Sequence, residues 1–322
     1  TMTKIALPQR TNCLISTGSI LIDLPLKVTH FPKAGSAITA LSNGARVGGG
    51  YTIARATASQ QVPVALASTL GTGPNSAQVR ASMLRDGVEN VVQELVGDIG
   101  TCTTLIEPGG QRTFITTEGV ESEPQLEDLE NLELVPGDYV HAAGYDLVHQ
   151  RTREGISQWL STLPAGVQLV VDFGPAVVDI LDRILLKIMA RADIITGNRR
   201  EIDQLRARLG GVELMYQAAP NAMFVRRIGS AGCELLLPGH GQPTLVSGYP
   251  MSVADTTGAG DTHTGVLIAS LLKGYSVLQS ARRANAAAAL MISQREDNRA
   301  PSAEDIDQLL REARDAESLA AI

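Results

Sequence analysis

Cysteine is scarce in this sequence of 322 residues, which contains only Cys13, Cys102 and Cys233. Each lies in a stretch that we predict to be a strand, and no two of them form a C-x-x-C pair. Disulfide-stapled domains and zinc fingers need several cysteines at short, regular spacings, so neither is indicated. The scarcity of cysteine instead favours a protein of the reducing cytoplasm.

Long apolar runs and an excess of positive charge are also missing. No uninterrupted apolar run approaches the roughly 20 residues that cross a bilayer, and the first residues lack the order of a signal peptide. The net charge is −7 and the arginines are scattered along the chain, which argues against a nucleic-acid partner. With 44% hydrophobic residues, we expect a soluble globular protein that binds neither membranes nor nucleic acids.

Several motifs of known chemistry are absent. The sequence has no G-x-x-x-x-G-K-[ST], which excludes a P-loop kinase, and no H-R-D catalytic-loop motif, which argues against a protein kinase. Its five histidines never occur as H-E-x-x-H, so zinc-dependent hydrolysis is not indicated. Any anionic ligand must be bound by a different local arrangement.

One such arrangement is the sequence D-T-T-G-A-G-D from Asp255 to Asp261, after which we predict a helix that begins near Thr262. Gly258 and Gly260 allow the backbone to turn so that its N–H groups converge, and the unpaired donors of the first helical turn add to them. Such a turn binds anions. Asp261 can then take a proton from a hydroxyl group that attacks a phosphoryl group. The alternative is a glycine-rich loop in which Asp261 only caps the helix.

Two further stretches near the N-terminus are candidates for ligand binding. Residues 13–18 predict a buried strand, and Asp23 lies just beyond its end, where open α/β sheets bind ligands. Taken alone, an Asp at this position is more often a solvated turn residue. The glycines at 48–50, followed by Thr52, precede a helix of small residues at 53–58, and they allow a ligand or a neighbouring helix to approach the backbone closely.

Two later strand ends carry polar or charged residues. Asn198 and Glu201 follow a strand and are three residues apart, so they face the same way on a first helical turn. This spacing is typical of a capping box and is also compatible with an outer-shell magnesium site. Arg227 ends the next strand, where it can neutralise phosphate charge or form a surface ion pair.

The order of the predicted elements indicates an α/β fold. Strands that alternate with helices predict a parallel, doubly wound sheet whose polar strand ends meet at one edge. Two other segments alternate apolar with polar residues and have turn residues between them, so we expect them to form one small, separate sheet. The expected strands of the main sheet include 64–70, 139–143 and 169–171, the helices 151–163, 176–190 and a tail from Ala303, and the small-sheet segments 25–47 and 102–117 with a turn at 108–110.

The complete motif at 255–261 resembles the C-terminal motif of the PfkB/ribokinase family of small-molecule kinases. The stretches at 18–23, 48–52 and 198–201 resemble other motifs of the same family, and the likeness extends from Gly18 to about Pro301. Leu21 and Thr52 stand where the family often has Asn, which leaves the acceptor open.

This resemblance implies one ribokinase-like α/β domain over residues 1–322, with a doubly wound, mostly parallel sheet flanked by helices and a small β-sheet lid inserted at about 22–47 and 98–118. It implies an ATP-dependent kinase that uses Mg²⁺, and in some members K⁺, to phosphorylate a hydroxymethyl group of a small sugar, as ribokinases and fructokinases do. A nucleoside kinase of the same family and a catalytically silent sugar-binding regulator are the alternatives. Lids of this kind often pair, which suggests a homodimer.

The resemblance also implies roles for individual residues. Asp261 is the general base, and the N–H groups of Gly258, Ala259 and Gly260 form the anion hole. Asn198 and Glu201 order Mg²⁺ through water, and Asp255 is a candidate to bind K⁺. The acceptor side comprises Asp23, Gly48, Gly49, Thr52 and Asp261, with Tyr145 added because it follows a strand of the same sheet edge; the nucleotide side comprises Asn198, Arg227, Gly229, Gly232, Thr256, Gly258, Gly260 and Asn285.

Overall fold

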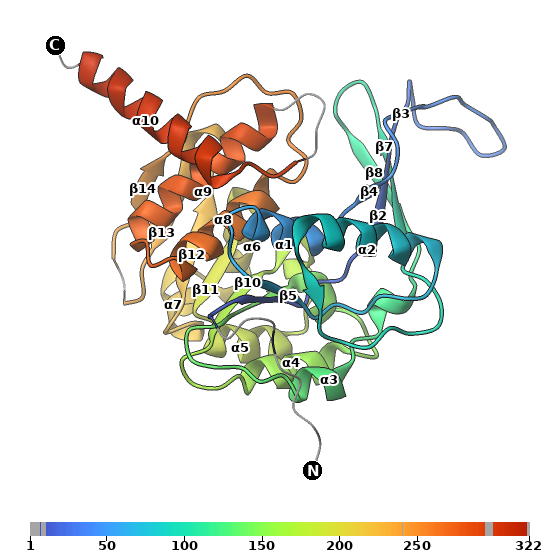
Figure 1. Cartoon of the computed structure of the whole chain (residues 1–322), viewed down its shortest axis with the longest axis horizontal. Helices are drawn as coiled ribbons and strands as arrows, with labels where there is room; N and C mark the ends of the chain where they lie inside the picture. Colours follow the sequence, from blue (N-terminus) through green and yellow to red (C-terminus); the bar gives the residue numbers. More distant parts are fainter. Residues whose placement is uncertain (1–6, 8–10, 240, 294–298, 321–322) are drawn as a thin grey trace.

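A nine-stranded sheet forms the centre of the computed structural model, which describes residues 7, 11–239, 241–293 and 299–320 (Figure 1). Its strand order is β14-β13-β12-β11-β10-β9-β1-β5-β6. The strands are β1 (Leu14–Ser16), β5 (Val64–Leu66), β6 (Glu89–Asn90), β9 (Tyr139–Ala143), β10 (Gln168–Asp172), β11 (Ile194–Asn198), β12 (Met223–Arg227), β13 (Gly232–Leu236) and β14 (Thr244–Ser247).

The sheet is doubly wound, as the sequence predicts. Strand β1 pairs in parallel with β5 on one side and with β9 on the other, and only β13 and β14 at one edge are antiparallel to their neighbours. The chain builds outward from β1 in both directions, so the order of the strands reverses between β1 and β9. Ligands of open α/β sheets bind at the carboxyl ends of the strands at such a reversal. The segment after β1, which includes Asp23, leaves the sheet at this point.

Helices cover both faces of the sheet, and each face has its own apolar core. On one face Leu129, Ile156 and Ile184 pack with Leu205. On the other face Ile53, Val79 and Leu267 pack beneath the strands. The first face carries α3 (Leu126–Glu130), α4 (Arg153–Ser161), α5 (Asp182–Arg191), α6 (Arg199–Leu209) and α7 (Val212–Ala218); the second carries α1 (Tyr51–Ala58), α2 (Pro74–Asp86), α8 (Ala259–Leu272) and α9 (Val277–Ser293), with α10 (Ala303–Ala320) packed outside α9.

A separate small sheet stands beside this layered body, at the upper right of Figure 1. Strand β2 is at its centre, where it pairs in parallel with β7 and antiparallel with β3 and β4. A turn joins β7 to β8, with the amide of Gly110 donating to the carbonyl of Glu107 at 2.8 Å, as the sequence predicts. The strands are β2 (Ile22–Lys27), β3 (Leu41–Ser42), β4 (Arg46–Val47), β7 (Thr101–Ile106) and β8 (Arg112–Thr116).

Several expected boundaries differ from the structure. The strand predicted at 13–18 is confined to β1, so Cys13 lies one residue before it, and β5 ends at Leu66 rather than at residue 70. The helix predicted at 176–190 is divided into a 3-10 turn, η3 (Gly174–Val178), and α5. Arg208 of α6 donates to the carbonyls of Val177 and Ile180, and these bonds replace helical ones at the break. Within the described ranges, every helix is too short or too polar to cross a bilayer.

Candidate active site

The D-T-T-G-A-G-D segment forms a tight turn at the start of α8. Gly258 has φ +76°, in the left-handed region that glycine adopts without strain. The amide of Thr257 donates to Oδ1 of Asp255 at 2.9 Å, which closes the turn. The helix begins at Ala259, three residues earlier than the sequence predicts, so Asp261 lies in its first turn. We refer to residues 255–261 as the anion-binding turn.

The amides of this turn are only partly used by the protein itself. The N–H of Ala259 donates to the carbonyl of Thr256 over a long 3.3 Å. The N–H groups of Gly258, Gly260 and Asp261 make no hydrogen bond to any other residue of the described ranges. Donors left free at the start of a 14-residue helix attract an anion.

Close packing of α1 against α8 brings the two glycine-rich stretches together. A Cβ added at Gly265 would lie 2.7 Å from Cβ of Ala56, so only glycine allows this approach. Thr57 of α1 donates from Oγ1 to the carbonyl of Gly265 at 3.0 Å. As a result Thr52, in the first turn of α1, lies beside Gly258: a Cβ there would be 3.5 Å from Cγ2 of Thr52.

Asp23 lies in β2 against the glycines that precede α1. A Cβ added at Gly48 would lie only 1.9 Å from Oδ2 of Asp23, and one at Gly49, where φ is +62°, would lie 2.4 Å from the carbonyl oxygen of Ser19. Burial raises the pKa of Asp23 to about 6, although Arg46, its partner across β4, acts to lower it. The glycines therefore leave room for the carboxylate of Asp23, whose raised pKa lies close to neutral pH.

Asp261 is half-buried among other charged side chains. Its pKa is raised to about 7, mainly by burial and in addition by the charges of Asp172, Asp23 and Glu201, whereas Arg227 acts to lower it. These groups come from β10, β2, α6 and β12. The structure thus brings the predicted acceptor-side and nucleotide-side acids around one carboxylate whose pKa suits a base near neutral pH.

Asn198 and Glu201 form the capping box of α6. Oδ1 of Asn198 accepts from the amide of Glu201 at 2.9 Å, and Oε2 of Glu201 accepts from the amide of Asn198 at 2.8 Å. Burial, together with the charge of Asp172, raises the pKa of Glu201. No group of three or more His, Cys, Asp or Glu side chains in the described ranges is placed to hold a metal ion directly. Any metal here must keep most of its ligands as water or substrate oxygens, as magnesium commonly does.

The remaining nucleotide-side residues lie around the ends of β12, β13 and β14. Gly229 and Gly232 have φ of +69° and +105°, and a Cβ at Gly232 would lie 2.1 Å from the carbonyl of Val246. Asn285 is buried in α9, where its amide donates to the carbonyls of Val246 and Ser247 at 2.9 and 3.1 Å. Its amide group therefore serves the protein's own β14. Arg227 also points into the protein, where it donates to Asp172 and Thr196.

Two arginines to which the sequence analysis assigned no role face Asp255. Nη1 of Arg46 lies 3.7 Å from one carboxylate oxygen of Asp255, and Nη2 of Arg112 lies 4.0 Å from the other. Burial alone would raise the pKa of Asp255, but the hydrogen bonds from Thr257 and the two guanidinium groups outweigh it and lower the pKa. Both arginines belong to the small sheet, so ion pairs connect that sheet to the anion-binding turn.

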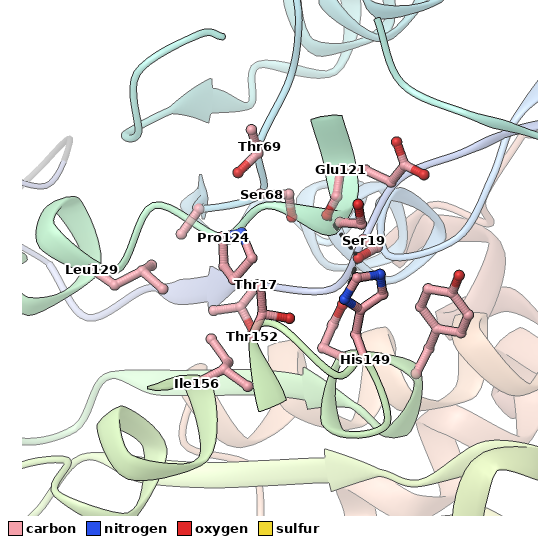
Figure 2. Close-up of a pocket in the computed structure, with 14 residues that line it drawn as sticks. Thr17, Ser19, Ser68, Thr69, Glu121, Pro124, Leu129, His149, Thr152 and Ile156 are labelled. Atoms are coloured by element: carbon pink, nitrogen blue, oxygen red, sulfur yellow. Dashed lines mark hydrogen bonds between the residues drawn. The ribbon is translucent and has the colours of Figure 1, made fainter. Parts of the chain in front are cut away.

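Tyr145 lines a separate small cavity at the carboxyl ends of β1 and β5. Figure 2 shows apolar Leu129 and Ile156 on one side of it and polar Ser19 and His149 on the other. The cavity has a volume of about 20 Å³, which is room for about one water molecule. The hydroxyl of Tyr145 donates to Glu118 at 3.5 Å. No residue of the anion-binding turn lines this cavity.

Comparisons with known proteins agree with this geometry. The sequence pattern of the pfkB family carbohydrate kinases matches residues 12–304. An uncharacterized sugar kinase of Escherichia coli, YegV, is 29% identical over 296 residues, which cover 90% of this chain and 91% of the relative.

Solved structures show the same fold. A ribokinase from Giardia lamblia superposes with a TM-score of 0.74 at 20% identity, covering 94% of this chain and 100% of that one. A ribokinase from Arabidopsis thaliana, solved with ribose and ATP, gives 0.67 at 21% identity, covering 94% and 99%. The fold is therefore ribokinase-like, and the resemblance seen in the sequence motifs is confirmed. The chain belongs to the PfkB family of carbohydrate kinases and is an ATP-dependent phosphotransferase.

Proposed function

We propose that the protein transfers the γ-phosphoryl group of ATP to a hydroxymethyl group of a small sugar, with Asp261 as the general base. The observation that carries this proposal is the position of Asp261: its half-buried carboxylate lies in the first turn of α8, beside amides that make no other hydrogen bond. A base and an anion-binding turn in contact are what attack by a hydroxyl on a phosphoryl group requires.

In the proposed reaction, the acceptor hydroxyl loses its proton to Asp261 while its oxygen bonds to the γ-phosphorus and the bond to the β-phosphate oxygen breaks, which releases ADP. The amides of Gly258, Ala259 and Gly260 stabilise the charge on the transferring group. A phosphoryl oxygen can replace the long bond from Ala259 to Thr256. Donors of this kind are worth about 3–4 kcal/mol each when one is removed.

The acceptor lies, in this proposal, between Asp23, Gly48, Gly49 and Thr52, with the small sheet as its lid. Packing of α1 on α8 supports this placement, because it puts Thr52 beside Gly258. Tyr145, which lines the neighbouring small cavity, is the remaining candidate on the acceptor side. The ribokinase from Arabidopsis thaliana was solved with both ribose and ATP, and a fructokinase from Vibrio cholerae was solved with fructose, which favours a pentose or hexose as the acceptor here.

The nucleotide lies on the opposite side of the anion-binding turn, against Thr256, Gly229 and Gly232. Asn285 does not face the nucleotide directly; its side-chain amide donates to the carbonyl of Val246 and so fixes β14 on this side. Asn198 and Glu201 fit an outer-shell magnesium site, since the capping box leaves one oxygen of Glu201 free of backbone bonds. Bound magnesium would neutralise phosphate charge. Asp255 is the candidate to bind K⁺, and a cation there would compete with the guanidinium groups of Arg46 and Arg112 for its carboxylate.

A panel of sugars and nucleosides, read by ADP release through coupled enzymes, tests the proposal. We expect one sugar or a small group of sugars to stimulate ADP release well above the rate with ATP alone. Stimulation by nucleosides only would indicate a nucleoside kinase. ATP binding with no stimulation by any acceptor would contradict the proposed activity.

A further inference from the structure

Arg227 is the best-connected side chain beneath the anion-binding turn. Its Nη1 donates to Oδ2 of Asp172 at 3.1 Å, to Oγ1 of Thr196 at 2.7 Å and to Oγ1 of Thr264 at 3.2 Å, and its Nη2 donates to the same oxygen of Asp172 at 3.1 Å. Only 14% of its side chain is exposed. These bonds join β10, β11 and α8, so the guanidinium group is held from three elements at once.

The guanidinium group lies directly against the first turn of α8. A Cβ added at Gly260 would be 3.2 Å from Nη2 of Arg227 and 3.4 Å from its Cζ, so a larger residue there would press on the guanidinium plane. Thr264, whose hydroxyl accepts from Arg227, also donates to the carbonyl of Gly260 at 3.1 Å. Gly260 therefore serves packing on Arg227 in addition to offering its amide.

The positive charge of Arg227 lies at the N-terminal end of α8, where it does not stabilise the helix. A helix N-terminus carries a partial positive charge, and a cation beside it is unfavourable. Asp172 compensates for part of this, but a neutral side chain would fill the same space without the conflict. A buried cation at this position is useful when negative charge must be accepted on the other side of the turn.

The negative charge that Arg227 can balance is that of the carboxylates around Asp261. Three carboxylates act to raise its pKa, from Asp172, Asp23 and Glu201, and Arg227 is the cation that opposes them. Glu201 lies 3.8 Å from Nη2 of Arg227, so Arg227 is paired with two of those three acids. His141 also faces this group and is fully buried, and because burial lowers its pKa to about 4 it adds no charge at neutral pH.

We propose that Arg227 is a positioning residue: anchored by Asp172, its guanidinium group fixes the first turn of α8 and supplies the permanent positive charge that keeps the carboxylate of Asp261 ionised. This inference rests on the proposed function, because it assumes that Asp261 is the base. It gives Arg227 a role behind the anion-binding turn in place of direct contact with the nucleotide.

The test is the pH profile of kcat/KM for the sugar identified by the panel. A base must be ionised, so activity falls on the acid side with the pKa of the base. Arg227→Met removes the opposing cation, and we expect the acid limb to move up by about one pH unit or more. Arg227→Lys keeps the charge but loses the two-pronged donor set, so the limb should stay near its wild-type position while kcat falls.

Arg226→Met is the matched control. Arg226 is the preceding residue of β12, with 17% of its side chain exposed, and it pairs with Asp203 and Glu234 at 2.9 Å each on the other face of the sheet. We expect its removal to leave the acid limb in place. Asp172→Asn keeps an acceptor for Arg227 and removes one repelling charge from Asp261, so its acid limb should move down.

The outcomes separate this inference from the proposed function. An active Arg227→Met enzyme with an unmoved acid limb, or a limb that moves equally in Arg226→Met, would overturn the inference and leave the kinase activity intact. If Arg227→Met does not fold, the same comparison is made with Arg227→Lys and Asp172→Asn, and an upward shift in Asp172→Asn would overturn it. A wild-type protein that is inactive with every acceptor would instead overturn the proposed function.

Discussion

The carboxylate of Asp23 lies where the side chain of residue 48 would be, so only glycine fits at position 48. Because a Cβ at Gly48 would lie 1.9 Å from Oδ2 of Asp23, alanine must push the carboxylate away from the proposed acceptor position. Losing a hydrogen bond to a charged group costs about 1.5–3 kcal/mol, or roughly 10- to 100-fold in affinity. We therefore expect Gly48→Ala to raise the KM for the sugar by about that factor and to leave the KM for ATP nearly unchanged, as measured by steady-state kinetics.

Gly109→Ala is the control for this change. Gly109 lies in the turn between β7 and β8, and a Cβ there would meet no atom within 4 Å. Its variant should have wild-type KM values for both substrates. Equal KM values for the sugar in the Gly48→Ala and Gly109→Ala enzymes would show that Asp23 does not bind the acceptor.

Asp261 is expected to cost the protein stability at neutral and alkaline pH. Its pKa rises on folding from 3.8 to about 7, so, as far as this group is concerned, the folded protein is most stable relative to the unfolded chain below pH 3.8, and this stability is lost as the pH rises through about 7. Each pKa unit corresponds to about 1.4 kcal/mol. After a discount for partial solvent screening, we expect ionisation of Asp261 to lower the free energy of unfolding by about 2 kcal/mol.

Asp261→Asn removes this cost because the amide does not ionise. Urea unfolding should therefore show the variant to be more stable than the wild type by about 2 kcal/mol near pH 8, with the difference disappearing near pH 4. A difference that is the same at both pH values would mean that the carboxylate is not destabilised by its surroundings.

At the scale of single elements, α6 shows how one sequence signal can serve two purposes. The spacing of Asn198 and Glu201 predicts a capping box, and both of its hydrogen bonds are present. The same spacing suggests a magnesium site, and nothing in the residues alone distinguishes the two, since a cap and an outer-shell site use the same side of a first helical turn.

Asn198→Ala separates the two roles. Loss of the cap should lower the free energy of unfolding by about 1 kcal/mol, measured by urea denaturation. If the pair also orders magnesium, the variant will need more Mg²⁺ to reach half of its maximal rate. Asn221→Ala, at an exposed position after α7, should change neither quantity, and a stability loss without any change in the Mg²⁺ requirement would limit Asn198 to capping.

At the scale of the whole molecule, the small sheet presents apolar side chains to solvent. Phe114 is 61% exposed and Ile115 55%, both in β8, while Leu41 of β3 is 74% exposed. Phe114 and Ile115 are consecutive in β8 and face opposite sides of the sheet, and β3 forms the other edge, so both edges expose apolar side chains that favour association with a second copy. We propose that two lids pair to form a homodimer.

Phe114→Asp tests this pairing by sedimentation. The wild-type chain is expected to sediment as a dimer, and the variant as a monomer, because a carboxylate cannot be buried in an apolar interface without a partner. Leu84→Asp is the control, since Leu84 is 87% exposed on α2, a helix of the main body and not a strand of the small sheet. Dissociation in both variants, or in neither, would argue against pairing through the small sheet.

The sequence predicted the order and type of most elements because each carries its own local signal. The βαβ alternation predicts the doubly wound sheet, and the spacing of Gly258 and Gly260 predicts the anion-binding turn. The contacts of Asp23 with Arg46, and of Asp255 with Arg46 and Arg112, could not be predicted, because they depend on strand register and on the approach of the small sheet. The inward position of Arg227 was equally hidden, since a strand-end arginine has no local signal for which way it points.

The central claim is that Asp261 is the base of phosphoryl transfer, and the most direct test compares wild-type and Asp261→Asn enzymes with the sugar found by the panel. The account predicts that kcat falls by about 10²- to 10⁴-fold, the usual worth of general-base catalysis, while the Kd for ATP measured by calorimetry changes little. A variant that turns over at the wild-type rate would contradict the account.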